Sequence, residues 1–134
     1  MKDTLRVVCA ADNRFFPYCA AMLLSLSKNQ DSQRFAYVLV GANENSDEVE
    51  KLSRFLDMHI PHEIIRVSDD AIDRHRPSFA QLPRSAYYRL VMQDFLPTDV
   101  DRVLYLDGDL LVNGNLRALW ETDLGEDVIG AVPV

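Results

Sequence analysis

The stretch that decides the fold is RVLYLDGDLLV, from Arg102 to Val112. Its first five residues, Arg102–Leu106, form a short apolar run typical of a buried strand. Side chains two apart in an extended chain point to the same side, so Asp107 and Asp109 should converge where this strand ends. Leu110–Val112 predicts a short strand after them, and Asn113-Gly114 a turn.

The sequence before this stretch alternates between strand and helix patterns. Further strands are expected at 5–11, 35–41 and 62–67, and helices at 16–30, from Asn45 through Leu56, and at 85–95. A long polar loop is expected at 68–83, one helical turn at 116–121 and a last strand at 127–134. This order predicts one α/β domain over residues 1–134, with a mostly parallel, Rossmann-like sheet flanked by helices.

Composition narrows the function classes. Lys and Arg number 14 against 21 Asp and Glu, giving a net charge of −7, which argues against a nucleic-acid partner. No apolar run approaches the ~20 residues of a membrane span, and the first residues lack the pattern of a secretion signal. We therefore expect no transmembrane segment and a cytoplasmic location. Cys9 and Cys19 fall in apolar patterns and are expected to be buried free thiols.

Two places follow the predicted strands where an α/β sheet binds ligands, outside the carboxyl ends of its strands. One is Asp107-Gly108-Asp109. Two convergent carboxylates repel each other unless a cation lies between them, and hard oxygen ligands favour Mg²⁺ or Mn²⁺. Gly108 removes a side chain where a nucleotide could approach the backbone. The alternative is a solvated acidic turn.

The other place is the loop after the first strand. Ala10 and Ala11 are small enough to let a base or ribose approach, and Asp12 could accept a hydrogen bond from either. Alternatively, Asp12 caps the helix that follows. Arg89, in the predicted helix at 85–95, could hold phosphate or sugar oxygens, or could be an ordinary surface arginine.

Three segments carry a family resemblance. They are VVCAADNRFFPYCAAMLLSL near the start, RSAYYRLVMQDFLP in the middle, and VDRVLYLDGDLLVNGNLRALWETDLGEDVIGAV at the end. In order and spacing they resemble glycosyltransferase family 8, the retaining sugar transferases that include lipopolysaccharide galactosyl- and glucosyltransferases. The resemblance covers essentially the whole chain and implies the nucleotide-diphospho-sugar transferase (GT-A) fold.

The resemblance also implies ligands and roles. It implies a UDP-glucose or UDP-galactose donor, a Mn²⁺ (or Mg²⁺) ion held by Asp107 and Asp109, and a glycan or lipopolysaccharide acceptor. The donor-binding residues it indicates are Ala10, Ala11, Asp12, Arg14, Leu82, Arg89, Asp107, Gly108 and Asp109. One departure lies at Asn13-Arg14-Phe15, where relatives carry Asp-Asn-Tyr or similar, so Phe15 cannot offer a hydroxyl.

A second departure is length. Family members are roughly twice as long as this chain, within ordinary domain size. The second half would carry a histidine metal ligand, the acceptor pocket and the group nearest the anomeric carbon, so no catalytic residue is identified here. We expect the donor-binding half of a transferase, with weak donor binding and little transfer by itself, peripheral to the inner membrane in a full-length protein. An exposed edge at the last strand would favour self-association.

Two other functions fit parts of the pattern. A strand ending in Asp-x-Asp also opens haloacid-dehalogenase-type phosphohydrolases, but no lysine follows Asp109 here. A non-catalytic module that binds only the sugar nucleotide is the other alternative.

Overall fold

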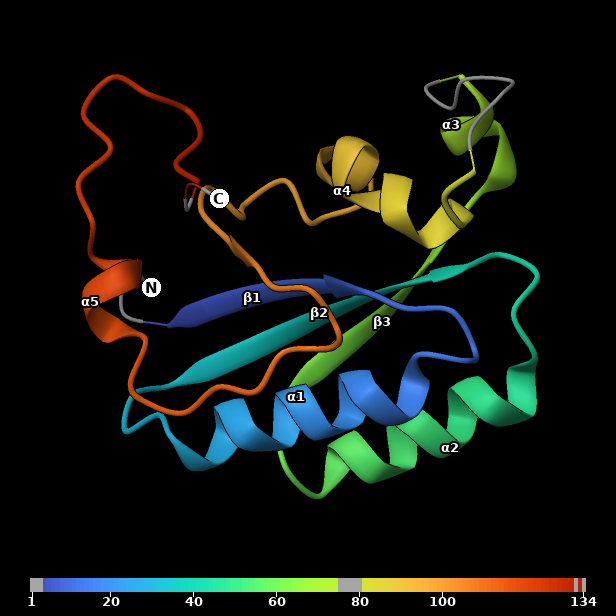
Figure 1. Cartoon of the computed structure of the whole chain (residues 1–134), viewed down its shortest axis with the longest axis horizontal. Helices are drawn as coiled ribbons and strands as arrows, with labels where there is room; N and C mark the ends of the chain where they lie inside the picture. The colour runs from blue at the N-terminus through green and yellow to red at the C-terminus, as the bar shows by residue number, and fades with distance from the viewer. Residues whose placement is uncertain (1–3, 75–80, 132, 134) are drawn as a thin grey trace.

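The fold is a four-stranded parallel sheet with helices on both faces (Figure 1). The computed structural model describes residues 4–74, 81–131 and 133. The strands are β1 (Leu5–Ala10), β2 (Arg34–Gly41), β3 (His62–Val67) and β4 (Leu104–Tyr105). They lie in the order β3-β2-β1-β4, and each pair is parallel. The predicted α/β class and parallel sheet are confirmed.

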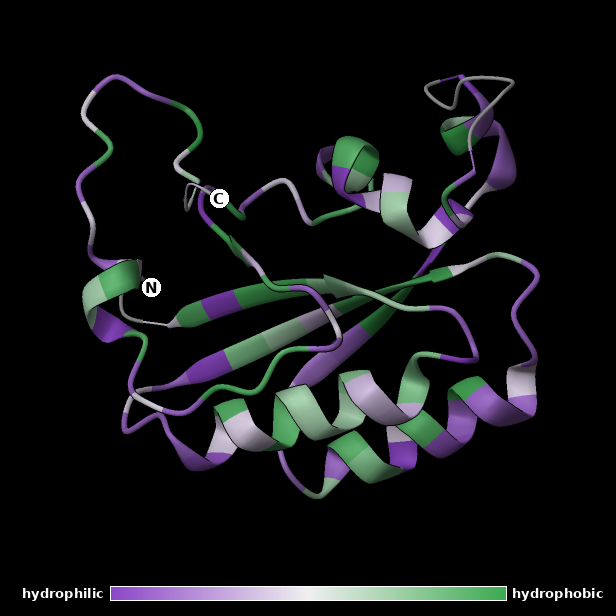
Figure 2. Cartoon of the chain, viewed as in Figure 1, coloured by the Kyte–Doolittle hydropathy of each residue, from purple (hydrophilic) through white to green (hydrophobic). Residues whose placement is uncertain are grey.

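Two long helices cover one face of the sheet. α1 (Phe16–Lys28) and α2 (Ser46–Asp57) pack on the side chains of β1 and β2 that point to this face (Figure 1). α1 accommodates Pro17 in its first turn, where a missing N–H costs nothing. The Asn45 side chain accepts bonds from the N–H groups of Asp47 and Glu48 at 2.9 and 3.1 Å, so Asn45 caps the start of α2. Figure 2 shows hydrophobic residues along β1, β2 and α1.

The opposite face is covered by shorter helical pieces. These are α3 (Asp69–Asp73), the 3₁₀ turn η1 (Arg84–Tyr87), α4 (Tyr88–Val91) and the 3₁₀ turn η2 (Met92–Asp94). The prediction of one continuous helix at 85–95 is wrong. Tyr88 and Val91 are the buried residues of α4, a spacing of three that also suits 3₁₀ turns, and Val91 leaves helical geometry with φ −118°.

The predicted loop at 68–83 is also wrong in part, because α3 forms at its start. Ser68 precedes α3 with extended backbone, and two aspartates occupy the first turn, where the helix dipole favours negative charge. Residues 75–80 of that predicted loop lie outside the described residues.

The segment after β4 differs from the predicted strand at Leu110–Val112. β4 itself is two residues long, and the chain then runs along the end of α1 instead of pairing as a strand. Side chains of α1 and of Asn29, which follows it, bind the backbone of this segment. Val112 N–H donates to Ser25 Oγ at 2.9 Å, and Val112 C=O accepts from Asn29 Nδ2 at 2.9 Å. Hydrogen bonds to these side chains replace those of a sheet.

Of the two elements predicted after residue 115, the helical turn is confirmed and the last strand is wrong. The single helical turn forms as α5 (Arg117–Trp120), and its Trp120 is buried. The last strand, expected at 127–134, is absent from residues 127–131 and 133. Val128 and Ile129 are 92% and 79% exposed, because no described strand lies beside them to take up their backbone groups. Of the helices described, none is long and apolar enough to span a membrane.

Gln30 gives a test of how the segment after β4 is held. Its side chain is nearly buried, donating to Gly114 C=O at 3.0 Å and accepting from Leu116 N–H at 2.8 Å. Gln30→Ala leaves both backbone groups without these partners, so we expect the free energy of unfolding to fall by about 1–3 kcal/mol in urea titrations. The exposed Gln93→Ala is the control. Equal effects of the two substitutions would contradict this role.

Candidate functional site

The two aspartates after β4 lie at the carboxyl end of the sheet. Leu106 N–H donates to Val8 C=O at 2.9 Å, which carries the β1–β4 pairing up to Asp107. Gly108 is buried, and a Cβ on it would lie 3.6 Å from Ala10 O and 3.7 Å from Cys19 Cβ. The glycine therefore packs on the end of β1 and the start of α1, and Asp107 and Asp109 on either side of it are exposed.

Arg89 reaches the acid pair from α4. Its Nη2 lies 2.9 Å from Asp107 Oδ1, and its guanidinium stacks 4.7 Å from the centre of the Tyr105 ring. The paired side chains are 45% and 53% exposed, so this ion pair adds little to stability and can exchange its partners. The structure thus brings together two predicted site residues from segments 18 positions apart.

Asp12 lies on the other side of β1 from this pair. Its Oδ1 accepts from Arg14 N–H at 3.0 Å, and its Oδ2 accepts from Ser85 Oγ at 3.4 Å. The Asp12 carbonyl also accepts from the N–H groups of Phe15 and Phe16, so Asp12 caps the turn that leads into α1, although Phe15, directly before the helix, makes no side-chain cap bond. The Asp12 carboxylate thus orders its own loop and contacts η1.

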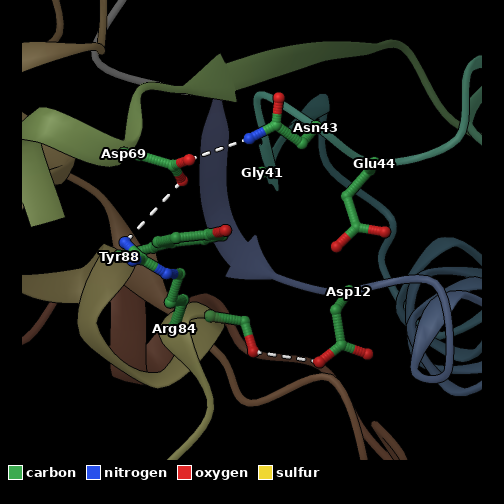
Figure 3. A pocket seen from close by; sticks show the side chains of 8 residues that line it. Asp12, Gly41, Asn43, Glu44, Asp69, Arg84 and Tyr88 are labelled. Atoms are coloured by element: carbon green, nitrogen blue, oxygen red, sulfur yellow. Dashed lines mark hydrogen bonds and ion pairs between the residues drawn. The ribbon is translucent and has the colours of Figure 1, made fainter.

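A cavity of about 310 Å³ opens beside Asp12 (Figure 3). It lies between the ends of β1, β2 and β3 and the short helices η1 and α4. Its lining residues are Asp12, Gly41, Asn43, Glu44, Asp69, Arg84, Ser85 and Tyr88. Of these, the sequence had suggested Asp12 alone. Asn43, Glu44 and Asp69 follow β2 and β3, so the strand-end rule applied to every strand would have found them.

The remaining predicted residues have differing environments. Ala11 is buried and Ala10 is half-buried at the end of β1, beside the acid pair. Arg14 and Leu82 are exposed, Leu82 to 59%, and neither lines the cavity. Cys9 and Cys19 are buried free thiols, as predicted, and their sulfur atoms lie 3.3 Å apart. The hydrogen bond with Cys19, together with burial, raises the pKa of Cys9.

The acid pair fits part of a divalent metal site. Within residues 4–74, 81–131 and 133, no group of three or more His, Cys, Asp or Glu side chains is placed to hold a metal ion. Asp107 and Asp109 would supply oxygen ligands to a small divalent ion, which takes about six and usually keeps water and phosphate oxygens among them. The carboxylates therefore suit Mg²⁺ or Mn²⁺ bound together with a phosphate ligand.

The fold and this site define a class of protein. A parallel α/β sheet with paired acids and an adjoining cavity at its carboxyl edge has the arrangement in which open α/β domains hold their ligands. Residues 6–134 match the model of glycosyl transferase family 8. The chain belongs to this family.

Individual relatives agree with the family match. The chain is 26% identical over 133 residues to general stress protein A of Bacillus subtilis, covering 97% of this chain and 46% of that protein. It is 21% identical over 130 residues to the lipopolysaccharide 1,3-galactosyltransferase of Salmonella typhimurium, covering 97% and 39%. The chain thus spans less than half the length of these relatives.

Solved structures show the same fold. The crystal structure of galactosyltransferase LgtC with donor and acceptor sugar analogues superposes with a TM-score of 0.76 at 26% identity, over 90% of this chain and 44% of that one. The glycosyltransferase GlyE of Streptococcus pneumoniae gives 0.63 at 27% identity, over 92% and 28%. The predicted GT-A fold is therefore confirmed, and the family match argues against the phosphohydrolase alternative.

The burial of Tyr105, the ring on which the Arg89 guanidinium stacks, can be tested by the pH dependence of stability. Burial, with a smaller effect of Asp107, raises its pKa from 10.0 to about 12. Between these values the unfolded chain loses the proton and the folded chain keeps it, so this contribution to stability falls as pH rises. We expect the stability advantage of the wild type over Tyr105→Phe to shrink from about pH 9 to about pH 12 in urea titrations. Tyr18→Phe, at a 58% exposed ring, is the control, and an equal pH trend there would contradict the prediction.

Proposed function

We propose that this chain is the donor-binding half of a retaining hexosyltransferase that takes glucose or galactose from a UDP-sugar. The observation that carries the proposal is the position of Asp107-Gly108-Asp109 against the end of β1, with Arg89 on Asp107 and Asp12 across the strand end. These groups surround the edge where a parallel sheet binds a nucleotide.

In this proposal Asp107 and Asp109 hold a Mn²⁺ or Mg²⁺ ion with the diphosphate of the donor. Such an ion supplies Lewis acidity, which stabilises the negative charge that builds up on UDP as the glycosidic bond breaks. The buried Gly108 fixes the loop, so that the two carboxylates keep their spacing without side-chain packing of their own. Ala10, Ala11 and Asp12 line the nucleoside side, with Arg14 and Leu82 at the margin.

Arg89 has two possible partners in this arrangement. In the free chain its guanidinium neutralises Asp107 in part, at 2.9 Å. Once a cation takes over that neutralisation, the guanidinium can turn to a phosphate or sugar oxygen without leaving a buried charge, because both groups are exposed. Its stacking on Tyr105 keeps it at the rim during the exchange.

The acceptor, a glycan or lipopolysaccharide precursor, is a further part of the proposal. Support comes from the names of relatives, such as the lipopolysaccharide 1,3-galactosyltransferase. The chain spans 46% or less of those relatives, so we assign no acceptor-binding or catalytic residue to it. Cytoplasmic location and self-association stay predictions.

Calorimetry with UDP tests the acid pair. We expect UDP to bind the 134-residue chain with Mn²⁺ present and to lose that binding in EDTA. Asp109→Ala should weaken Mn²⁺-dependent binding about tenfold or more, because even the outer partners of metal ligands contribute that much. The control is Asp101→Ala, an exposed acid on the approach to β4, which should bind as the wild type does.

UDP binding that is equal in Mn²⁺ and EDTA, or unchanged by Asp109→Ala, would contradict the assignment of the metal site. Sugar transfer assays with UDP-glucose and UDP-galactose then separate two cases. Binding without transfer by this chain supports a donor-binding half, whereas hydrolysis or transfer by the chain alone would show that it carries catalytic groups of its own.

A further inference from the structure

A pair of thiols lies between β1 and α1, and the proposed donor site has no use for it. Cys9 belongs to β1 and Cys19 to the first turn of α1, and both side chains are completely buried. Their sulfur atoms lie 3.3 Å apart, within hydrogen-bonding distance of each other. They are the two cysteines of the chain. The covalent product that two such thiols can form with each other is a disulfide.

Metal binding is the other common use of paired thiols, and the surroundings of this pair do not suit it. A structural zinc site takes four ligands. Across the described residues, no group of three or more His, Cys, Asp or Glu side chains could hold a metal ion. The further polar contact of Cys9 Sγ is with a backbone carbonyl, that of Tyr37, at 4.0 Å. Oxidation is therefore the chemistry that the pair supports best.

The sulfur atoms need only a small movement to form a bond. A disulfide bond is about 2.05 Å long, so the two atoms must approach by about 1.3 Å from their present separation. Small rotations of both side chains cover this distance at a modest cost in torsional energy. The bond would join the end of β1 to the start of α1 and enclose residues 10–18, the segment that carries Asp12.

The loop of the acid pair covers these thiols. A Cβ on Gly108 would lie 3.7 Å from Cys19 Cβ and 3.9 Å from Cys19 Cα, so the loop backbone packs directly on Cys19. The hydrogen bond with Cys19, together with burial, raises the pKa of Cys9 and leaves little reactive thiolate, so oxidation requires a local opening. Residues 106–116 form neither helix nor strand, so this cover opens more easily than β1 or α1.

We propose that Cys9 and Cys19 are an oxidation site, which hydrogen peroxide converts to a disulfide within the chain. One thiol attacks a peroxide oxygen and becomes a sulfenic acid, and the other oxygen leaves as water with the thiol proton. The second thiol then attacks the sulfenic sulfur, and the hydroxyl group leaves as a second water with the second thiol proton. The two sulfurs lose two electrons in total, and one peroxide molecule gains them.

This oxidation is coupled to the donor site, a consequence that rests on the proposed function. UDP and a divalent ion held by Asp107 and Asp109 restrain the loop around Gly108, so the cover opens only after they leave. A ligand that binds the closed form alone lowers the population of the open form by the factor 1 + [L]/Kd. UDP at about ten times its dissociation constant, with Mg²⁺ present, should therefore slow disulfide formation roughly tenfold.

Peroxide treatment of the 134-residue chain, followed by thiol counting in denaturant, tests the oxidation site. We expect the two thiols to disappear together, with a mass loss of two hydrogens and a cross-linked peptide that joins Cys9 to Cys19. The product should migrate as a monomer, and dithiothreitol should restore both thiols. Cys19→Ala is the matched control, and it should give no bridge while keeping the circular dichroism of the wild type. The wild-type peptide map answers the question even where this variant does not fold.

Several outcomes would overturn the oxidation site. These are a disulfide between two chains, an oxygen adduct on either cysteine in place of the bridge, or two intact thiols after complete oxidation of Met58. Met58 is 71% exposed and serves as the marker of peroxide exposure.

The coupling to the donor site is tested by the rate of disulfide formation with UDP and Mg²⁺, and UDP in EDTA is the control that should not slow it. Equal rates in a chain that calorimetry shows to bind UDP with Mg²⁺ would overturn the coupling and leave the oxidation site standing. A chain that forms the disulfide and binds no UDP would contradict the proposed function alone.

Discussion

The short pairing of β1 with β4 is the constraint on which the site depends. Val7 and Val8 face Leu104 and Tyr105, and the bond from Leu106 N–H to Val8 C=O closes the pair. The backbone hydrogen bonds of so short a strand cannot hold the following loop in place by themselves. Gly108 adds packing contacts, because its backbone lies at van der Waals distance from Ala10 and Cys19. The acid pair is therefore positioned by the first strand and helix of the chain, about a hundred residues away in sequence.

The distribution of charge along the carboxyl edge follows from this placement. The chain has a net charge of −7, and several of its acids gather where four parallel strands end. Like charges so close destabilise the free protein. Two arginines reduce the repulsion between these acids. Arg89 pairs with Asp107 of the acid pair, and Arg84 pairs with Asp73 on the cavity side. In the proposed function, a divalent ion bound together with the sugar nucleotide would bring the missing positive charge to the acid pair.

The parts of the fold that sequence predicts are those specified by local pattern. β1, α1, β2, α2 and β3 carry strong periodicity, and Asn45 marks the start of α2 by a cap that needs only its own neighbours. The errors lie where distant partners decide. Leu110–Val112 looks like a strand, but Ser25 and Asn29 take its backbone groups. Val128 and Ile129 have strand-forming side chains and no described neighbour to pair with.

The residues of the candidate site also fall into those that the sequence predicts and those that depend on distant partners. Asp107, Asp109 and Asp12 were visible because each follows an apolar strand, and Arg89 because of its place in the family pattern. Tyr88 was not visible, because its place at the cavity depends on Gly41 leaving space for the Tyr88 hydroxyl. A residue spacing in the helical segment indicates that Tyr88 is buried, but only the strand order and the missing Cβ show that its hydroxyl faces a cavity. A ligand that binds at this edge of the folded chain, and not to the unfolded chain, would stabilise the fold by an amount that grows with the logarithm of its affinity.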